Sequence, residues 1–357
     1  MSNPIFIARQ DTLDEKIIPA QLLNDYKLHG EYSFVFHTPE LWHKMCTHAY
    51  AANDQKVNGD ALEYVLTKAA PTGSYSLSNW MALLCDTAEQ AAQGLYAGIE
   101  TAGQLAQSSA AMAAVSGSEM AMNSICSVKT ALRAFAASKH WNSTVKENDM
   151  AIAKAAVALA NSNEFSAISS CAEMAENSTA MSVLAASETA MSVLADSATA
   201  RTALMGSSYY GKYMQNDTMC IAKLVVGFAN LASAGYSSMA GVAADATAMN
   251  AVAASSTAMN AVAASTTAMD ALYARKKQMK GGSASKSGKF IILEISASNA
   301  FDTSKYGYVT LSDGSKPDWS SYLAKYAFFQ KYPKYATYMR NDTDSDDYIY
   351  YFDITNP

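Results

Sequence analysis

The stretch TAMNAVAASSTAMNAVAASTTAMDALYARK, residues 247–276, consists of three successive copies of one decapeptide. Three earlier copies fill residues 179–208 as TAMSVLAASE, TAMSVLADSA and TARTALMGSS, and looser copies lie over 110–139. Residues 207–236, which are richer in Tyr, Gly and long apolar side chains, interrupt the two clear arrays. A fixed period of this kind indicates one structural unit that is used many times.

The ten-residue period favours short helices over one long helix. Ala, Met and Leu are strong helix formers, but ten residues of α-helix turn about 1000°, which is about 80° short of three full turns. The Met side chains would therefore spiral around a continuous helix. We predict one two-turn helix per decapeptide, with the repeated Thr as its N-cap. A continuous helix within a long oligomeric coiled rod is the alternative.

The apolar residues of each decapeptide fall on one helix face, since Met249, Val252 and Ala253 are spaced i, i+3 and i+4. A two-turn helix is unstable alone because nucleation is costly, so the units are expected to stack and bury these faces against one another. We predict a mainly α fold, with ten-residue short-helix repeats in an elongated or solenoid-like body and a small β-rich C-terminal domain. The predicted repeat core contains Met181, Met191, Met249, Met259, Met269, Val252 and Val262.

Composition divides the chain into four regions. Residues 1–75 are mixed in composition, and residues 76–275 form the Ala/Ser/Met-rich helical body. Residues 276–288, KKQMKGGSASKSG, are basic and then Gly/Ser-rich, which is typical of a flexible linker. Residues 289–357 are rich in Tyr, Asp and β-branched residues, and the apolar run 290–295 indicates a buried strand. Because a core of about 70 residues is marginal alone, oligomerisation is expected to supply the missing burial.

Charge and composition argue against several classes of function. Charged residues make up 16% of the chain and the net charge is −6, whereas nucleic-acid binding depends on clustered Lys and Arg. No apolar run approaches the roughly 18 residues of a membrane-spanning helix. The N-terminal residues have no signal-peptide pattern, so synthesis in a cytoplasm is expected. The five cysteines form no CxxC pair, and no catalytic motif is present. We predict no enzyme activity, no cofactor, no nucleic-acid partner and no membrane insertion.

An acidic turn near the C-terminus is a candidate cation site. Asp342, Asp344 and Asp346 match positions one, three and five of a calcium-binding loop, and Asp353 falls at position twelve. The pattern departs from such a loop because Asp347 replaces the glycine at position six and Asp replaces Glu at position twelve. A solvated acidic turn before a strand is the alternative interpretation.

Aromatic residues gather in the C-terminal region, with Asp and Asn nearby. Such groups suit sugar or protein recognition, because rings stack on apolar surfaces while carboxylates bind hydroxyls. The alternative is that most of these rings fill a small core or a subunit interface. The candidate binding surface consists of Trp319, Tyr322, Tyr335, Tyr338, Tyr348 and Tyr350.

The decapeptide resembles repeats found in virion structural proteins of tailed bacteriophages, particularly fibre, collar and tail-associated proteins. Ser256–Ala264 and Thr247–Ala254 carry the resemblance, with the variant Ser178–Ala186. The Gly/Ser stretch followed by Gly288–Leu293 is similar to the start of small C-terminal β-domains in such proteins. The resemblance covers residues 105–300.

The resemblance implies a non-enzymatic virion component that is made in the host cytoplasm and assembles as an oligomer, with a homotrimer favoured. Residues 1–75 would attach the chain to other virion proteins, and the C-terminal domain would contact a host surface glycan or protein. The alternative is an intracellular repeat scaffold or an adhesin-like binding protein.

Overall fold

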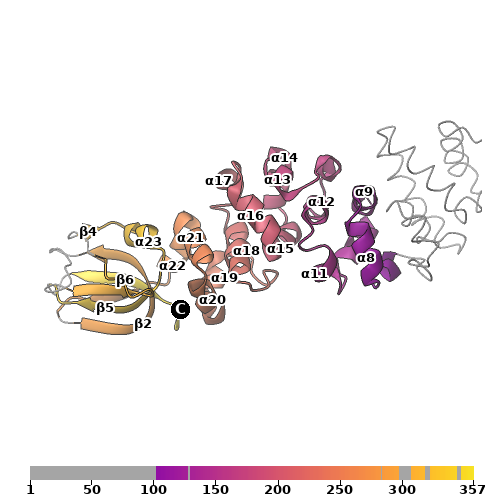
Figure 1. The fold of residues 1–357 in the computed structure, drawn as a ribbon. Helices are drawn as coiled ribbons and strands as arrows, with labels where there is room; N and C mark the ends of the chain where they lie inside the picture. Colours follow the sequence, from indigo (N-terminus) through magenta and orange to yellow (C-terminus); the bar gives the residue numbers. More distant parts are fainter. Residues whose placement is uncertain (1–101, 128, 283, 297–306, 318–321, 344–346) are drawn as a thin grey trace, which may run out of the picture. The chain divides into compact units, whose positions relative to one another are not determined.

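The computed structural model describes residues 102–127, 129–282, 284–296, 307–317, 322–343 and 347–357 (Figure 1). The chain divides into two compact units at Val183 and Leu184. The first 75 residues, for which we predict attachment to other virion proteins, lie outside the described part. The described chain is mainly helical with a small antiparallel sheet near the C-terminus, which confirms the predicted class of a mainly α fold with a small β region.

Short helices make up the described chain up to residue 273, with gaps of a few residues between most of them. In the first unit, with α14 crossing its boundary, they are α7 Ala102–Leu105, α8 Ser109–Ser116, α9 Glu119–Ser127, α10 Lys129–Ala136, α11 Trp141–Thr144, α12 Asp149–Leu159, the 3₁₀ helix η4 Asn163–Ala167, α13 Cys171–Ala175 and α14 Ser178–Ala185. In the second unit they are α15 Glu188–Asp196, α16 Ala198–Gly206, α17 Tyr210–Tyr213, α18 Thr218–Phe228, α19 Met239–Ala244, α20 Ala246–Ala254, α21 Ser256–Ala264 and α22 Thr266–Tyr273.

The alternative of one continuous helix does not apply to the described repeats, because each decapeptide there forms its own short helix. The residues between α20, α21 and α22 are extended, as at Ser255 with φ −103° and ψ 112°. The longest described helices, α12 and α18, have eleven residues each. None of the described helices combines the length and apolarity that crossing a bilayer requires.

In the decapeptide helices whose N-cap the structure describes, the cap lies two positions before the repeated Thr or the residue in its place, so the prediction of a Thr cap is wrong. The side chain of Ser187, for example, accepts a hydrogen bond from the backbone N–H of Ala190, while Thr189 is already the second residue of α15. A cap must be extended and one residue outside the helix, and Thr189 is helical. The same arrangement caps the other units through Ser108, Ser118, Asn177, Ser197, Asp245, Ser255 and Ser265.

Replacing Ser187 with Ala is expected to lower the free energy of unfolding of the second unit by about 1 kcal/mol, because one backbone N–H at the start of α15 loses its acceptor. Urea unfolding of the full chain, followed by circular dichroism, measures the change. The matched control is Thr189→Ala, for which we expect a change within about 0.5 kcal/mol because the side chain is exposed. A larger loss for Thr189→Ala than for Ser187→Ala would contradict the cap assignment.

A longer repeat contains the decapeptides. Each helix from α13 to α18 begins 69 residues after its counterpart from α7 to α12, as with Ser109 of α8 and Ser178 of α14. The long helices α12 and α18 both end before an asparagine with positive φ, 60° at Asn161 and 57° at Asn230. Residues 207–236, which we expect to interrupt the arrays, therefore contain α17 and α18, regular parts of the second copy.

A third copy of the longer repeat is incomplete. The helices α19, α20, α21 and α22 each begin 68 residues after α13, α14, α15 and α16. No helices corresponding to α17 and α18 follow among the residues that the structure describes; β1 begins at Lys277 instead. The predicted core residues occupy equivalent places in these copies. All seven are buried: Met181, Met191, Met249, Met259, Met269, Val252 and Val262.

The two long helices each bury a lysine at the same position. Lys154 of α12 is fully buried, and its Nζ donates to Asn123 Oδ1 at 2.8 Å and to the Phe165 carbonyl at 3.0 Å. Glu119 of α9 completes the arrangement at 3.2 Å. Lys223 of α18 is equally buried.

The second lysine has equivalent partners. Lys223 Nζ lies 3.4 Å from the carboxylate of Glu188 and donates to the Ser233 carbonyl at 3.2 Å. A buried ammonium needs such acceptors because an unpaired buried charge is very costly. Each lysine therefore ties its long helix to a neighbouring helix and to the loop that follows.

Six antiparallel strands form the C-terminal sheet, in the order β1-β6-β2-β5-β3, with β4 paired to β2. The strands are β1 Lys277–Lys280, β2 Ala284–Ser296, β3 Gly307–Leu311, β4 Tyr322–Leu323, β5 Ala336–Asn341 and β6 Tyr348–Asp353, and the helix α23 Ala327–Lys331 lies between β4 and β5. The predicted strand over 290–295 is part of β2. The segment 276–288 differs from the predicted linker, because β1 and the first half of β2 pair with β6 and β5.

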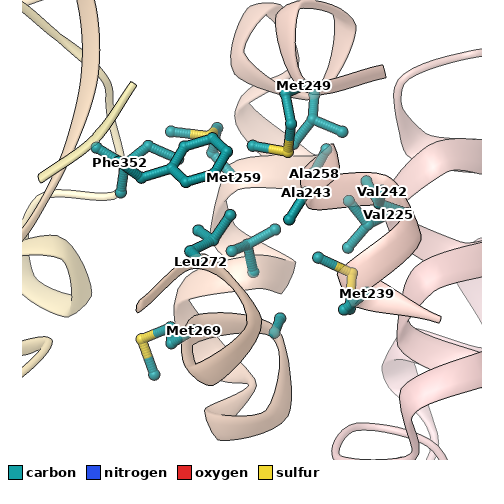
Figure 2. Close-up of a cluster of buried hydrophobic side chains, with 14 of the residues drawn as sticks. Val225, Met239, Val242, Ala243, Met249, Ala258, Met259, Met269, Leu272 and Phe352 are labelled. Atoms are coloured by element: carbon teal, nitrogen blue, oxygen red, sulfur yellow. The ribbon is translucent and has the colours of Figure 1, made fainter. Parts of the chain in front are cut away.

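Alternate residues of β2 pack into two different cores. Ile291 and Leu293 join the helices α18–α22 in one cluster, whereas Phe290 and Ile292 join a second cluster within the sheet. Figure 2 shows Phe352 of β6 beside Met259 of α21 in the first cluster, with Val225 of α18 on the other side of the helical layer. The helices α21 and α22 therefore lie between α18 and the sheet.

Candidate binding surface

The predicted tyrosine surface separates into several groups. Tyr348 and Tyr350 of β6 lie together, with ring centroids 4.4 Å apart, and Tyr350 packs edge-on against Tyr273 of α22 at 6.1 Å. Tyr273 in turn packs at right angles to Tyr326 at 5.7 Å. Two of the predicted residues, Tyr348 and Tyr350, thus belong to an aromatic group that also contains Tyr273. Tyr273 lies in α22, a helix of the third repeat copy. Trp319 lies outside the described residues, and the backbone of Tyr322 belongs to β4.

Polar contacts within this aromatic group join the sheet to α22. The hydroxyl of Tyr273 donates to Glu294 at 2.6 Å, and Lys325 Nζ donates to Asp270 at 2.9 Å. Tyr326 also donates its hydroxyl to Asp270. We call the set Asp270, Tyr273, Glu294, Lys325 and Tyr326 the sheet–helix joint. The hydroxyls of this joint donate hydrogen bonds to its carboxylates. The joint therefore holds the sheet and the helix together rather than offering these groups to a ligand.

Ammonium groups lie over the central ring of the joint. Lys276 Nζ is 3.9 Å from the centroid of Tyr273 and Lys325 Nζ is 4.3 Å from it. Such cation–π contacts add attraction at partly exposed sites. Burial, followed by the hydrogen bond to Asp270, raises the pKa of Tyr326 to about 12. The hydrogen bond from Tyr326, followed by that from Lys325, lowers the pKa of Asp270.

The second unit is expected to lose stability as the pH rises from about 10 to about 12. An unfolded tyrosine titrates near pH 10, while the pKa of Tyr326 is about 12 in the fold. Folding therefore favours the neutral form of the Tyr326 hydroxyl. The resulting stabilisation of the folded state is fully present below about pH 10 and is lost as the pH passes through about 12. Urea unfolding across this range measures the fall, which should be shallower in Tyr326→Phe. Equal slopes in both proteins would contradict the assignment.

Tyr335 and Tyr338 lie apart from the joint. Tyr335 is half-buried against the helix–sheet core, with Lys289 Nζ 5.8 Å from its ring centroid. Tyr338 of β5 packs at 5.4 Å against Tyr308 of β3. Lys316 Nζ lies 4.3 Å from the Tyr308 ring. Tyr308 was not among the sequence candidates, because only strand pairing places it beside Tyr338.

Tyr308 and Tyr338 belong to one outward face of β2, β5 and β3. Across these strands Ser287, Tyr338 and Thr310 are in register, as are Ser285, Arg340 and Tyr308. All six side chains are exposed or half-buried, while the intervening Val309 and Met339 point into the sheet core. We call these six residues the outer sheet face. Two rings with neighbouring hydroxyls and a guanidinium can stack on and hydrogen-bond a polar ligand.

Of the four aspartates in the predicted cation site, the structure describes Asp342 and Asp353. Asn341, next to Asp342, pairs with Ala284, whereas Asp353 pairs with Phe290, so the two aspartates lie about 20 Å apart along β2 at about 3.3 Å per residue. Asp344 and Asp346 lie outside the described residues. After Asp347 the chain continues as the strand β6.

Basic side chains pair with both described aspartates of that pattern. Arg340 lies 2.5 Å from Asp342 Oδ2, while Oδ1 of Asp342 is buried without a hydrogen-bond partner among the described residues. Asp353 lies 3.5 Å from Lys277 and 3.8 Å from Lys286. Within the described ranges, no three His, Cys, Asp or Glu side chains are grouped so that they could hold a metal ion.

The described chain contains three buried cysteines. Cys126, Cys171 and Cys220 are free thiols, and burial is the main cause that raises the pKa of each. A raised pKa keeps a thiol protonated, and the thiolate is the nucleophile. These three thiols therefore behave as small apolar core residues.

No protein family model matches the chain, and no curated protein matches its sequence.

Proposed function

We propose that the chain is a non-enzymatic structural protein of a bacteriophage virion, a fibre or a collar- or tail-associated component. The observation that carries the proposal is the use of one helical module in successive copies, built from the decapeptides that resemble those of phage virion proteins. Its buried polar groups serve packing: Lys154 and Lys223 tie helices together. A module of this kind suits a structural body better than a catalytic pocket.

The repeated module suits a solenoid-like body. Each decapeptide helix is too short to be stable alone. Its apolar positions are instead buried in a core shared with neighbouring elements, as Met259 and Val262 of α21 are. Solenoids are built from units that contact only their neighbours. Assembly as a homotrimer, attached to other virion proteins through residues 1–75, completes the proposal.

Sedimentation velocity of the full-length chain tests the assembly. A species of three times 38.1 kDa with a high frictional ratio is expected for an elongated homotrimer. Mass spectrometry of purified particles of the phage that encodes the chain tests the location, and stoichiometric recovery in the particle is expected. A compact monomer would contradict the self-assembling component. Recovery from host cytoplasm but never from particles would favour the intracellular scaffold.

The outer sheet face is the surface that we propose for contact with the host, with a surface glycan as its ligand. Tyr308 and Tyr338 offer ring faces for sugar stacking, and Ser287 and Thr310 flank them with hydroxyls. Many copies on one particle would compensate for weak binding by each face, because a linked second contact benefits from a high effective concentration.

A double variant, Tyr308→Ala with Tyr338→Ala, should reduce binding of the full-length chain to host surface polysaccharide by at least about tenfold, since stacking residues dominate such contacts. The matched control is Tyr213→Ala in α17, another half-buried tyrosine with a lysine over its ring at 4.6 Å. Binding that survives the double variant, or that Tyr213→Ala abolishes equally, would overturn the assignment of this face.

A further inference from the structure

We infer that the C-terminal sheet is the terminating cap of the helical copies: it occupies, on the third copy, the place that the buried helix α18 occupies on the second. The inference concerns the function of this domain within the chain and does not depend on the proposed virion role. The second and third copies of the longer repeat differ in the element that covers their decapeptide helices.

In the second copy, α18 covers the decapeptide helices. It packs against α15 and α16 of its own copy, and it also packs against α19, α20, α21 and α22 of the next. Nearly all of its side chains are therefore buried, from Cys220 to Gly227. In the first unit, α12 packs in the same way against α9 and α10.

In the described residues of the third copy there is no such helix, yet its decapeptide helices are covered. Here α23 packs against α21, and β6 packs against α22. Phe329 of α23 and Phe352 of β6 are fully buried in the same cluster as Met259 and Leu272. Figure 2 shows Phe352 beside Met259 in this cluster. The sheet therefore supplies the apolar surface that a further long helix supplies in the earlier copies.

The wide buried face of α21 indicates that this helix is covered on two sides. Its buried residues Ala258, Met259, Ala261, Val262 and Ala263 span an arc of about 200° at 100° per residue. The buried residues of α20 span only about 140° on the same reckoning. A helix that packs on one side alone needs a narrower stripe, so α21 is built to lie between two layers.

Polar contacts fix the sheet in this position. Lys289 Nζ donates to Asn250 of α20 at 3.0 Å, and the sheet–helix joint links α22 to β2 and to the segment before α23. Only residues 274–276 separate α22 from β1. A tip domain that moved independently would need neither these contacts nor such a short connection. Terminal caps are a general requirement of repeat arrays, because the last unit otherwise exposes an apolar face.

Hydrogen exchange of the full-length chain tests the cap. Ile291→Ala removes a side chain that faces the helices, and Ile292→Ala removes its neighbour that faces the sheet core. Both variants should raise exchange in β2 and β6. If the sheet is a cap, exchange in α21 and α22 should rise by at least about tenfold in Ile291→Ala, while α8–α10 in the other unit remain unchanged. Unchanged exchange in α21 and α22 while the sheet exchanges faster would overturn the inference.

A surface variant keeps the test informative if the core variants unfold. Asp270→Asn weakens the contacts with Lys325 and Tyr326 and is exposed, so the sheet core retains its packing. We expect exchange in α22 to rise about threefold or more, with β3 and β5 unaffected. No change in α22 would show that the sheet does not hold this helix in place and would overturn the cap.

Discussion

Replacing Gly227 with Ala is expected to destabilise the second unit by about 3 kcal/mol, the upper end of the usual cost of overpacking a core. Gly227 lies on the face of α18 that meets α15. A Cβ atom there would lie 2.0 Å from the carbonyl oxygen of Ala195 and 2.9 Å from its carbonyl carbon. Backbone atoms cannot rotate aside, and Arg201 holds this carbonyl through a 2.6 Å hydrogen bond. The two helices must therefore separate, and urea unfolding of the full chain measures the cost.

The matched control is Gly241→Ala in α19 of the same unit. Its added Cβ would meet only Ser238 Oγ, at an ordinary 3.5 Å, and the residue is exposed. Because Ala is a better helix former than Gly, this variant should gain about 0.5–1 kcal/mol. Two substitutions of the same type in helices of one unit thus have opposite expected signs. A loss at Gly241 as large as that at Gly227 would show that close helix contact is not the cause.

Replacing Lys154 with Ala should destabilise the first unit by about 3 kcal/mol. The substitution leaves a cavity where the buried aliphatic stem lay, and it leaves the Phe165 carbonyl and Asn123 Oδ1 without their ammonium donor. Glu119 is 47% exposed, so water can solvate its carboxylate and limits the loss. Urea unfolding followed by circular dichroism measures the change.

Lys154→Met separates packing from hydrogen bonding. Met retains most of the volume of the lysine's aliphatic stem but cannot donate a hydrogen bond. About 2 kcal/mol of the destabilisation expected for Lys154→Ala should therefore remain. Lys223→Ala provides an independent replicate, because Lys223 has an equivalent burial and an equivalent carboxylate, Glu188. If Lys154→Met were as stable as the unmodified chain, the buried ammonium would have no structural role.

Local patterns predicted local structure well. The decapeptide period led to short helices and to the buried positions of Met249 and Val252, because helix geometry and the cost of exposing apolar side chains act within about ten residues. The N-cap was misplaced by two residues, since Ser and Thr adjoin each other in the repeat and both can cap. The linker prediction for 276–288 failed because strand pairing stabilises that segment despite its Gly/Ser composition.

Local sequence patterns did not predict which tyrosine rings of the candidate surface contact one another. Tyr338, Tyr348 and Tyr350 are close in sequence, yet the Tyr338 ring packs against Tyr308 on the outer sheet face while Tyr348 and Tyr350 pack toward Tyr273 of a helix. Residue type identifies rings that can stack, but the register of β5 with β3 selects the partner. Strand pairing likewise separates Asp342 from Asp353.

Short, capped, amphipathic helices and a β-rich end could be predicted from the residues alone, because caps and helical periodicity depend on neighbours along the chain. Three features depend on the tertiary fold: the six-helix module that recurs after 69 residues, its buried ties Lys154 and Lys223, and the packing of the sheet against α21 and α22. These features join segments tens of residues apart, and the burial that stabilises them depends on which surfaces meet in space.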